Sequence, residues 1–107
     1  MSNLGFDVLV HPEARLELAQ AIEYYRAVSP RLSREFYEEF REVINDMIEF
    51  PESSRQVSDI GVRRKRMMKF PYNLLYIIDP DAIYVVAVAH ERRHPDYWKH
   101  RLEEPGR

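Results

Sequence analysis

The apolar residues in the first half of the chain recur every three or four positions, which predicts two amphipathic helices after a short strand. Residues 6–10 form an apolar run with β-branched side chains, which is typical of a strand. Pro12 then lies in the first turn of a helix, and Ser29 and Pro30 end this helix and begin a second one. Pro51 ends the second helix, and the short connection predicts an antiparallel helical hairpin. The apolar stripes consist of Ala14, Leu18, Ala21, Ile22, Tyr25 and Val28 in the first helix and of Leu32, Phe36, Phe40, Val43, Ile44, Met47 and Phe50 in the second.

The second half of the chain has the pattern of strands. Residues 62–70 form an extended, highly charged segment, whereas residues 72–79 and 82–89 are apolar on both faces, as in central strands that helices cover. Residues 79–81 read Asp-Pro-Asp, which favours a tight turn between these two strands. Pro95 begins one short terminal helix. The order β-α-α-β-β-β therefore predicts an α+β fold, with the helical hairpin packed on one face of a small, mostly antiparallel sheet.

Length and composition exclude several classes of protein. A chain of 107 residues suits a single domain, which we expect to span residues 1–107. The absence of cysteine excludes disulfide scaffolds, thiolate metal sites and cysteine nucleophiles. The first ten residues lack the basic start and the apolar run of a signal peptide, and no stretch is long and apolar enough to span a membrane. We therefore expect a small cytoplasmic protein.

Charge is distributed unevenly along the chain. Residues 1–54 contain 5 Arg or Lys and 11 Asp or Glu, whereas residues 55–107 contain 11 and 7. This asymmetry gives a basic end that could meet phosphate or an acidic partner. An ordinary mixed surface whose charges are sorted along the chain is the alternative.

A first basic cluster lies within the charged strand and consists of Arg63, Arg64, Lys65, Arg66 and Lys69. Side chains alternate across a strand, so Arg64 and Arg66 share one face and the other three share the opposite face. Two guanidinium groups about 7 Å apart could bind neighbouring phosphates. The alternative is an edge strand whose charges prevent pairing with other chains.

A second basic cluster lies near the C-terminus, where cationic and aromatic residues are interleaved. This composition suits nucleic acid, because cations neutralise phosphate and rings stack on bases. It equally suits a protein interface, or a solvated terminus in which Trp98 folds back on the core. The cluster consists of His90, Arg92, Arg93, His94, Tyr97, Trp98, Lys99, His100 and Arg101.

Metal, cofactor and nucleophile motifs are weak or absent. His90 and His94 are four residues apart, but Pro95 interrupts the segment and no carboxylate completes a recognisable site. No Ser-His-Asp signature or glycine-rich phosphate loop is present. We therefore expect neither a metal nor a cofactor. His11 precedes a helix-starting proline, which favours a packing or capping role.

Two segments give the chain a resemblance to a known group of proteins. They are RKRMMKFPYNLLY at residues 64–76 and VAVAHERRHPDYW at residues 86–98, and they follow a helical hairpin. In this order, and over nearly the whole chain, the sequence resembles the RelE/ParE superfamily of bacterial toxins from type II toxin–antitoxin systems. The resemblance implies growth inhibition, a role in plasmid stabilisation, and a cognate antitoxin that wraps a segment over the toxin.

The superfamily has two activities, and the resemblance places candidate residues for one of them. RelE-like members cut messenger RNA on the ribosome, and their charge-stabilising residues correspond to Arg64, Arg66 and Arg92. Asn73 and Trp98 depart from this pattern, because the nucleases have arginine and tyrosine there. ParE-like members instead poison DNA gyrase and need no nuclease site.

Acid–base chemistry in a nuclease would require other side chains. Arginine stays charged, so Arg64 and Arg66 would only stabilise charge electrostatically. His90, His94 and Tyr97 could move protons if the fold aims them at the same cleft.

The long hairpin, with helices of about 17 and 20 residues, and the HERRHPDYW ending resemble ParE more than RelE. We therefore favour a gyrase-poisoning toxin that is not an enzyme. A ribosome-dependent mRNA endonuclease is the first alternative, and a non-toxic module that only binds its antitoxin is the second. The candidate residues for target binding are Arg92, Arg93, Tyr97, Trp98, Lys99 and Arg101.

Overall fold

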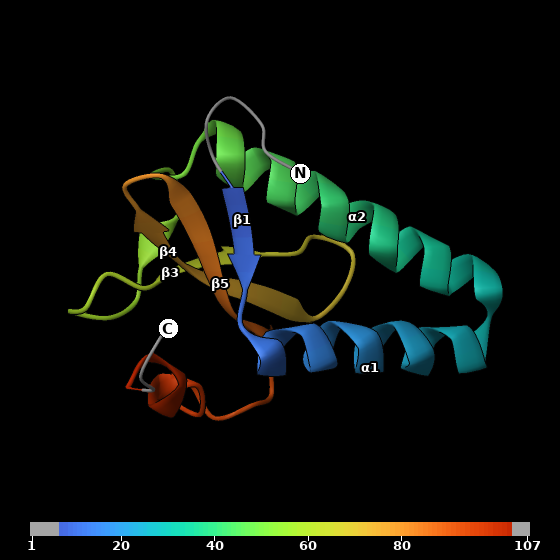
Figure 1. Cartoon of the computed structure of the whole chain (residues 1–107). Coiled ribbons are helices and arrows are strands. Elements are labelled where there is room, and N and C mark those ends of the chain that lie inside the picture. Colours follow the sequence, from blue (N-terminus) through green and yellow to red (C-terminus); the bar gives the residue numbers. More distant parts are fainter. Residues whose placement is uncertain (1–6, 104–107) are drawn as a thin grey trace.

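The computed structural model describes residues 7–103 and has the predicted α+β architecture (Figure 1). The hairpin-on-sheet arrangement is confirmed, with one additional short strand. Phe6, which the sequence assigns to the first strand, lies outside the described residues. The elements are β1 (Asp7–Val10), α1 (Pro12–Val28), α2 (Pro30–Glu49), β2 (Arg55–Gln56), β3 (Arg63–Arg66), β4 (Tyr72–Asp79), β5 (Ala82–His90) and a 3-10 helix (Lys99–Leu102).

The five strands form one sheet in the order β1-β5-β4-β3-β2. β1 is parallel to β5, with a register from Asp7 opposite Ala82 to Val10 opposite Val85, and the other neighbours are antiparallel. The sheet is therefore mixed, although mostly antiparallel as predicted. A long helical hairpin separates β1 from the other strands in sequence, which gives the chain room for the parallel crossover.

Side chains from the two turns hold the helical hairpin in place. The Nδ1 atom of His11 accepts a hydrogen bond from the Glu13 N–H at 3.0 Å, which confirms His11 as the N-cap of α1. Ser29 serves both helices, because its N–H donates to the Tyr25 carbonyl and its hydroxyl accepts from the Leu32 N–H. α2 ends at Glu49, and Phe50 is its C-cap rather than part of its last turn. Neither helix described in residues 7–103 is long and apolar enough to cross a membrane.

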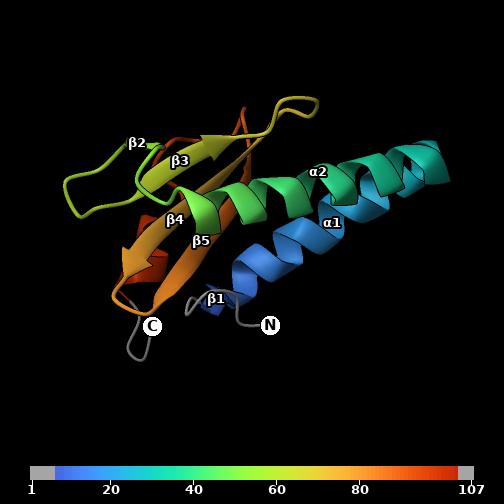
Figure 2. The same cartoon turned by 90° about the horizontal axis from the view of Figure 1, so that it is seen from above.

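The sheet is buried on both faces, which explains the two-sided apolar strands. Phe36, Met47, Tyr76 and Val85 belong to a core between the sheet and the helices. Figure 2 shows both helices on this face. A second core, on the opposite face, is covered by the C-terminal segment, defined here as residues 91–103. Its buried members are Val62, Leu75, Ile77, Tyr84, Val86, Ala87, Ala89 and Trp98.

Two segments differ from the sequence-based expectation. The charged strand covers only Arg63–Arg66, because the N–H groups of Met68 and Lys69 donate to the buried Glu39 carboxylate instead of to a strand. This strand is also not the edge of the sheet, since β2 pairs with its first two residues. The predicted helix at Pro95 is a series of turns, and the 3-10 helix begins at Lys99. The His94 side chain accepts from the Asp96 N–H and stabilises a turn there.

Candidate functional site

A cleft of about 190 Å³ lies where the C-terminal segment crosses the sheet, and we call it the C-terminal cleft. Its floor comes from β3, β4 and the end of β5, and its rim comes from residues 91–98. Leu75, Ala89, Pro95 and Trp98 form part of an apolar wall. The polar residues that line it include Arg64, Asn73, His90, Arg93, His94 and Tyr97.

Strand register explains why Arg64 reaches this cleft. Arg64 lies opposite Leu75, which belongs to the core under the C-terminal segment. Residues directly opposite in an antiparallel pair point to the same face, so Arg64 shares this face. Lys65 lies opposite Leu74, which packs toward the helices. Alternation along β3 therefore sends neighbouring cations to opposite faces of the sheet.

Only one of the three arginines that correspond to the nuclease pattern lines the C-terminal cleft. Arg64 lines the C-terminal cleft, whereas Arg66 and Arg92 do not. Arg66 forms an exposed ion pair with Glu91 at 3.7 Å. Arg92 is exposed, and its N–H donates to the His90 Nδ1 atom at 3.1 Å. The cleft therefore holds only one of the three guanidinium groups on which charge stabilisation would depend.

The three acid–base candidates line the cleft, but Tyr97 is unsuited to ionise. Its hydroxyl donates to the Glu17 Oε2 atom at 2.7 Å. Burial, together with this bond to a carboxylate, raises the pKa of Tyr97 well above its usual value of 10. His90 and His94 each accept a backbone N–H at Nδ1, which leaves Nε2 as the proton-bearing nitrogen of the neutral ring.

The candidate residues for target binding divide into a buried and an exposed group. Trp98 is 2% exposed and packs in the second core, which is the arrangement that the sequence left open as the alternative to a surface anchor. Arg101 is 3% exposed, so its guanidinium is also withdrawn from the surface. Tyr97 is half-buried. Arg92, Arg93 and Lys99 are exposed.

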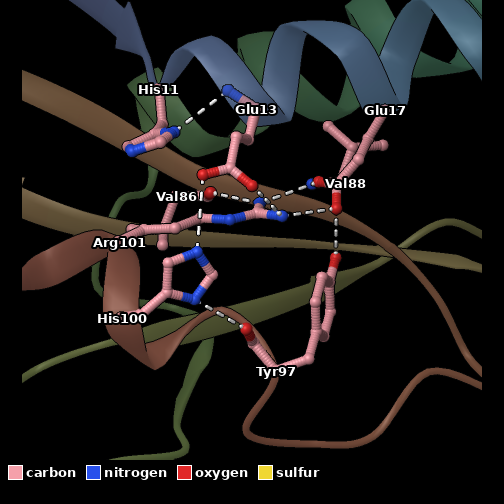
Figure 3. A network of polar contacts seen from close by, with 8 residues as sticks. All are labelled: His11, Glu13, Glu17, Val86, Val88, Tyr97, His100 and Arg101. Atoms are coloured by element: carbon pink, nitrogen blue, oxygen red, sulfur yellow. Dashed lines mark hydrogen bonds and ion pairs between the residues drawn. The ribbon is translucent and has the colours of Figure 1, made fainter.

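An ion pair between Glu17 and Arg101 fastens the C-terminal segment to α1 (Figure 3). The Arg101 Nη2 and Glu17 Oε2 atoms are 2.8 Å apart, and a second bond joins Nη1 to Oε1 at 3.0 Å. Burial alone would raise the pKa of Glu17, but the hydrogen bonds from Arg101, Tyr97 and the Val88 N–H outweigh it and lower the pKa. The exposed Glu13 carboxylate extends the network, because it lies 3.4 Å from His100 Nε2 and 3.7 Å from Arg101 Nη2.

The same pair completes the edge of the sheet where β1 ends. β1 pairs with β5 only as far as Val85. Next to this point, the pairing of β4 with β5 has an irregularity that leaves Val86 without a partner on β4. Arg101 Nη1 donates to the Val86 carbonyl at 3.0 Å, and the Val88 N–H donates to Glu17 Oε1 at 3.0 Å. Two side chains thus satisfy backbone groups that a longer β1 would otherwise pair.

Sequence analysis missed the structural roles of Glu17 and Glu39. Both carboxylates accept backbone N–H groups from elements distant in the chain. Each lies in line with the apolar stripe of its helix: Glu17 is three residues from Ala14, and Glu39 is three residues from Phe36. An acidic residue within an apolar stripe is the signal that could have identified them.

A second hollow, the hairpin groove, lies between β1, α1 and α2 and has a volume of about 270 Å³. Its lining is mainly apolar and includes Val8, Val10, Leu18, Phe40 and Ile44. Two cations, Arg15 and Arg41, also line it, and neither makes an ion pair within residues 7–103. An apolar groove whose cations have no partner among the described residues is suited to bind an apolar segment that carries acidic residues.

Comparisons with known proteins assign the chain to a family. Residues 8–95 match the model of a family described as the ParE toxin of the type II toxin–antitoxin system parDE. A solved structure described as the chromosomal ParDE TA system from P. aeruginosa has a similar fold, with a TM-score of 0.69. Sequence identity is 12%, over 80% of this chain and 96% of the other, so this likeness concerns the fold alone. No curated protein matches the chain.

Proposed function

The chain belongs to the ParE toxin family of type II toxin–antitoxin systems, and from this membership we propose that it arrests growth by poisoning DNA gyrase in the cytoplasm. We further propose that a cognate antitoxin neutralises it. The observation that carries the choice of target is the family match over residues 8–95, which concerns the ParE branch and not the RelE branch.

The arrangement of the basic residues supports a target other than the ribosome. A nuclease site needs several charge-stabilising groups around one reacting phosphate. Of the three corresponding arginines, only Arg64 lines the C-terminal cleft. The Tyr97 hydroxyl, which could otherwise act as a base, donates to Glu17 and has a raised pKa. These features disfavour RelE-like cleavage.

We assign target contact to the exposed cations of the C-terminal segment, Arg92, Arg93 and Lys99. The segment that carries them is held rigidly, because Trp98 is buried beneath it and Arg101 pairs with Glu17. A rigid support lowers the entropic cost of binding. Replacing Arg92 and Arg93 with Ala should therefore abolish toxicity while lowering the melting temperature by no more than about 4 °C, the cost of losing the contact between Arg93 and the Tyr97 ring.

We assign antitoxin binding to the hairpin groove. Its apolar lining would bury the apolar face of an amphipathic helix, and Arg15 and Arg41 would pair with acidic residues along that helix. An Arg15→Glu/Arg41→Glu variant should remain toxic when the antitoxin is produced with it. The wild-type chain should be neutralised under the same conditions.

Induction in living cells, with two readouts, tests the proposed target. Expression of the chain alone should arrest growth and produce gyrase-dependent DNA breaks, while messenger RNA mapped on ribosomes stays intact. The Arg92→Ala/Arg93→Ala variant serves as the control for folded but inactive protein. Codon-specific cuts in messenger RNA without DNA breaks would favour the endonuclease alternative. Unimpaired growth with abundant folded protein would favour the non-toxic module.

A further inference from the structure

The C-terminal cleft contains polar donors that no other group within the described residues engages. Within residues 7–103, the Arg64 guanidinium and the Asn73 side-chain amide make no hydrogen bond or ion pair, although both line the cleft. The neighbouring Arg63, in contrast, donates to the Glu52 and Ser54 carbonyls. Arg64 is thus an exposed cation that lines the cleft and has no partner among the described residues.

Two histidines add further donors to the same cleft. The Nδ1 atoms of His90 and His94 accept the N–H groups of Arg92 and Asp96, both at 3.1 Å. A ring nitrogen that accepts a hydrogen bond carries no proton, so the Nε2 atom of each neutral ring is a donor. Backbone contacts therefore fix both imidazoles in the form that donates to a ligand.

The indole of Trp98 carries a buried donor without a partner next to the same cleft. Trp98 lines the cleft and is 2% exposed, yet its Nε1–H has no hydrogen-bond partner within the described residues. A buried donor without an acceptor is unfavourable, and native structures rarely retain one without a reason. The Nε1 atom itself is fully buried, so only a ligand that displaces the surrounding side chains would reach it.

The acidic residues at the rim do not cancel the positive charge of the cleft. The Glu91 carboxylate is 3.7 Å from the Arg66 guanidinium, and the Asp96 carboxylate is 3.5 Å from the Lys99 ammonium group. Neither of these cations lines the cleft, so both carboxylates are compensated from outside. The charges of Arg64 and Arg93 remain to attract an anion.

We propose that the C-terminal cleft binds a phosphate group, carried by a free nucleotide or by a nucleic-acid strand. The donors come from β3, β4, the end of β5 and the 91–98 segment, so they approach from several directions. A phosphate presents tetrahedrally arranged oxygens to such a set, whereas a carboxylate presents two oxygens in one plane. The apolar wall that includes Leu75 and Trp98 lies beside them and can pack against a sugar or base. This binding requires no cleavage and is independent of the gyrase proposal.

Trp98 provides the readout, because it lines the cleft and is the only tryptophan of the chain. Its fluorescence is followed while the purified full-length chain is titrated separately with inorganic phosphate, a nucleoside monophosphate, a short oligonucleotide or acetate. The three phosphate compounds should change the emission saturably, and acetate should not. Tighter binding of the oligonucleotide than of the mononucleotide would assign the phosphate to a strand, and equal binding would assign it to a free nucleotide.

Two matched variants identify the site. Arg64→Gln removes the unengaged cation and should weaken phosphate binding at least about tenfold, as expected for a charge-assisted hydrogen bond. Lys65→Gln removes the same charge one residue away, on the helix-facing side of β3, and should change binding less than twofold. Equal losses in both variants would indicate general attraction and overturn the proposal. No saturable change with any phosphate compound, or acetate binding as tightly as phosphate, would also overturn it.

Discussion

Replacing Arg101 with Met should destabilise the protein far more than removing an exposed ion pair of the same length. The Arg101–Glu17 pair has a distance of 2.8 Å and side chains that are 4% and 11% exposed. The Arg26–Glu23 pair has a distance of 2.7 Å, but its side chains are 58% and 66% exposed. The two ion pairs therefore have nearly the same length and differ in how deeply their side chains are buried.

The magnitudes follow from desolvation. Arg101→Met retains much of the side-chain volume but leaves the Glu17 carboxylate buried without its cation and the Val86 carbonyl without its donor. Breaking a buried pair in this way costs about 3–5 kcal/mol, whereas an exposed pair contributes about 0–1 kcal/mol. At about 4 °C per kcal/mol for a domain of this size, the melting temperature should fall by at least about 12 °C in Arg101→Met. In Arg26→Met it should fall by less than about 4 °C.

The pH dependence of this difference provides a second test. In the wild type, Arg101 and the other donors lower the pKa of Glu17 below its ordinary value of 4.5, so their contribution is present above that value and is lost as the pH falls through the folded-state pKa. Without Arg101, burial should instead raise the pKa of Glu17. The difference in melting temperature between the wild type and Arg101→Met should therefore become smaller as the pH falls below 4.5.

Thermal and chemical denaturation, followed by circular dichroism at neutral and acidic pH, measure the loss of stability in each variant and its dependence on pH. Equal melting temperatures for Arg101→Met and Arg26→Met would refute the argument that burial sets the cost. If this difference between the wild type and Arg101→Met becomes larger as the pH falls, Glu17 is not the group that causes the pH dependence.

Two further predictions concern the second core and the turn after β3. Trp98→Ala should lower the free energy of unfolding by about 3–5 kcal/mol, since Trp98 is 2% exposed, and a normal melting temperature would instead favour the surface-anchor interpretation. Glu39→Ala should cost about 1–3 kcal/mol in urea denaturation, because the N–H groups of Met68 and Lys69 lose their acceptor, and a loss below about 0.5 kcal/mol would show that water replaces the carboxylate.

The helical hairpin could be predicted in detail because its signals are local. Apolar steps of three and four residues define each helix, and the proline and serine at the turn mark where one ends and the next begins. The structure has Ser29 capping both helices, as its place between the stripes indicates. A single sequence predicts best those elements whose structure depends on residues only a few positions apart in the chain.

The features that sequence analysis missed depend on contacts between distant segments. The parallel pairing of β1 with β5 joins residues more than seventy positions apart. The two-residue β2 has no apolar pattern, because both of its residues are exposed and charged or polar. Trp98 and Arg101 are residue types that are common at surfaces. Their burial is explained only by the position of Glu17 on α1 and by the second core on the sheet face opposite the helices. A basic and aromatic composition alone therefore does not distinguish an interface from a segment docked on a core.

The effect of the purified chain on DNA gyrase decides whether gyrase is its target. Gyrase, ATP and relaxed plasmid are incubated with the wild-type chain or with the Arg92→Ala/Arg93→Ala variant, while the same proteins are added to purified ribosomes with a defined message. We predict that the wild type causes linear, gyrase-bound DNA to accumulate and leaves the message intact, and that the variant leaves both gyrase activity and the message unaffected. Normal supercoiling together with a cleaved message would contradict the account.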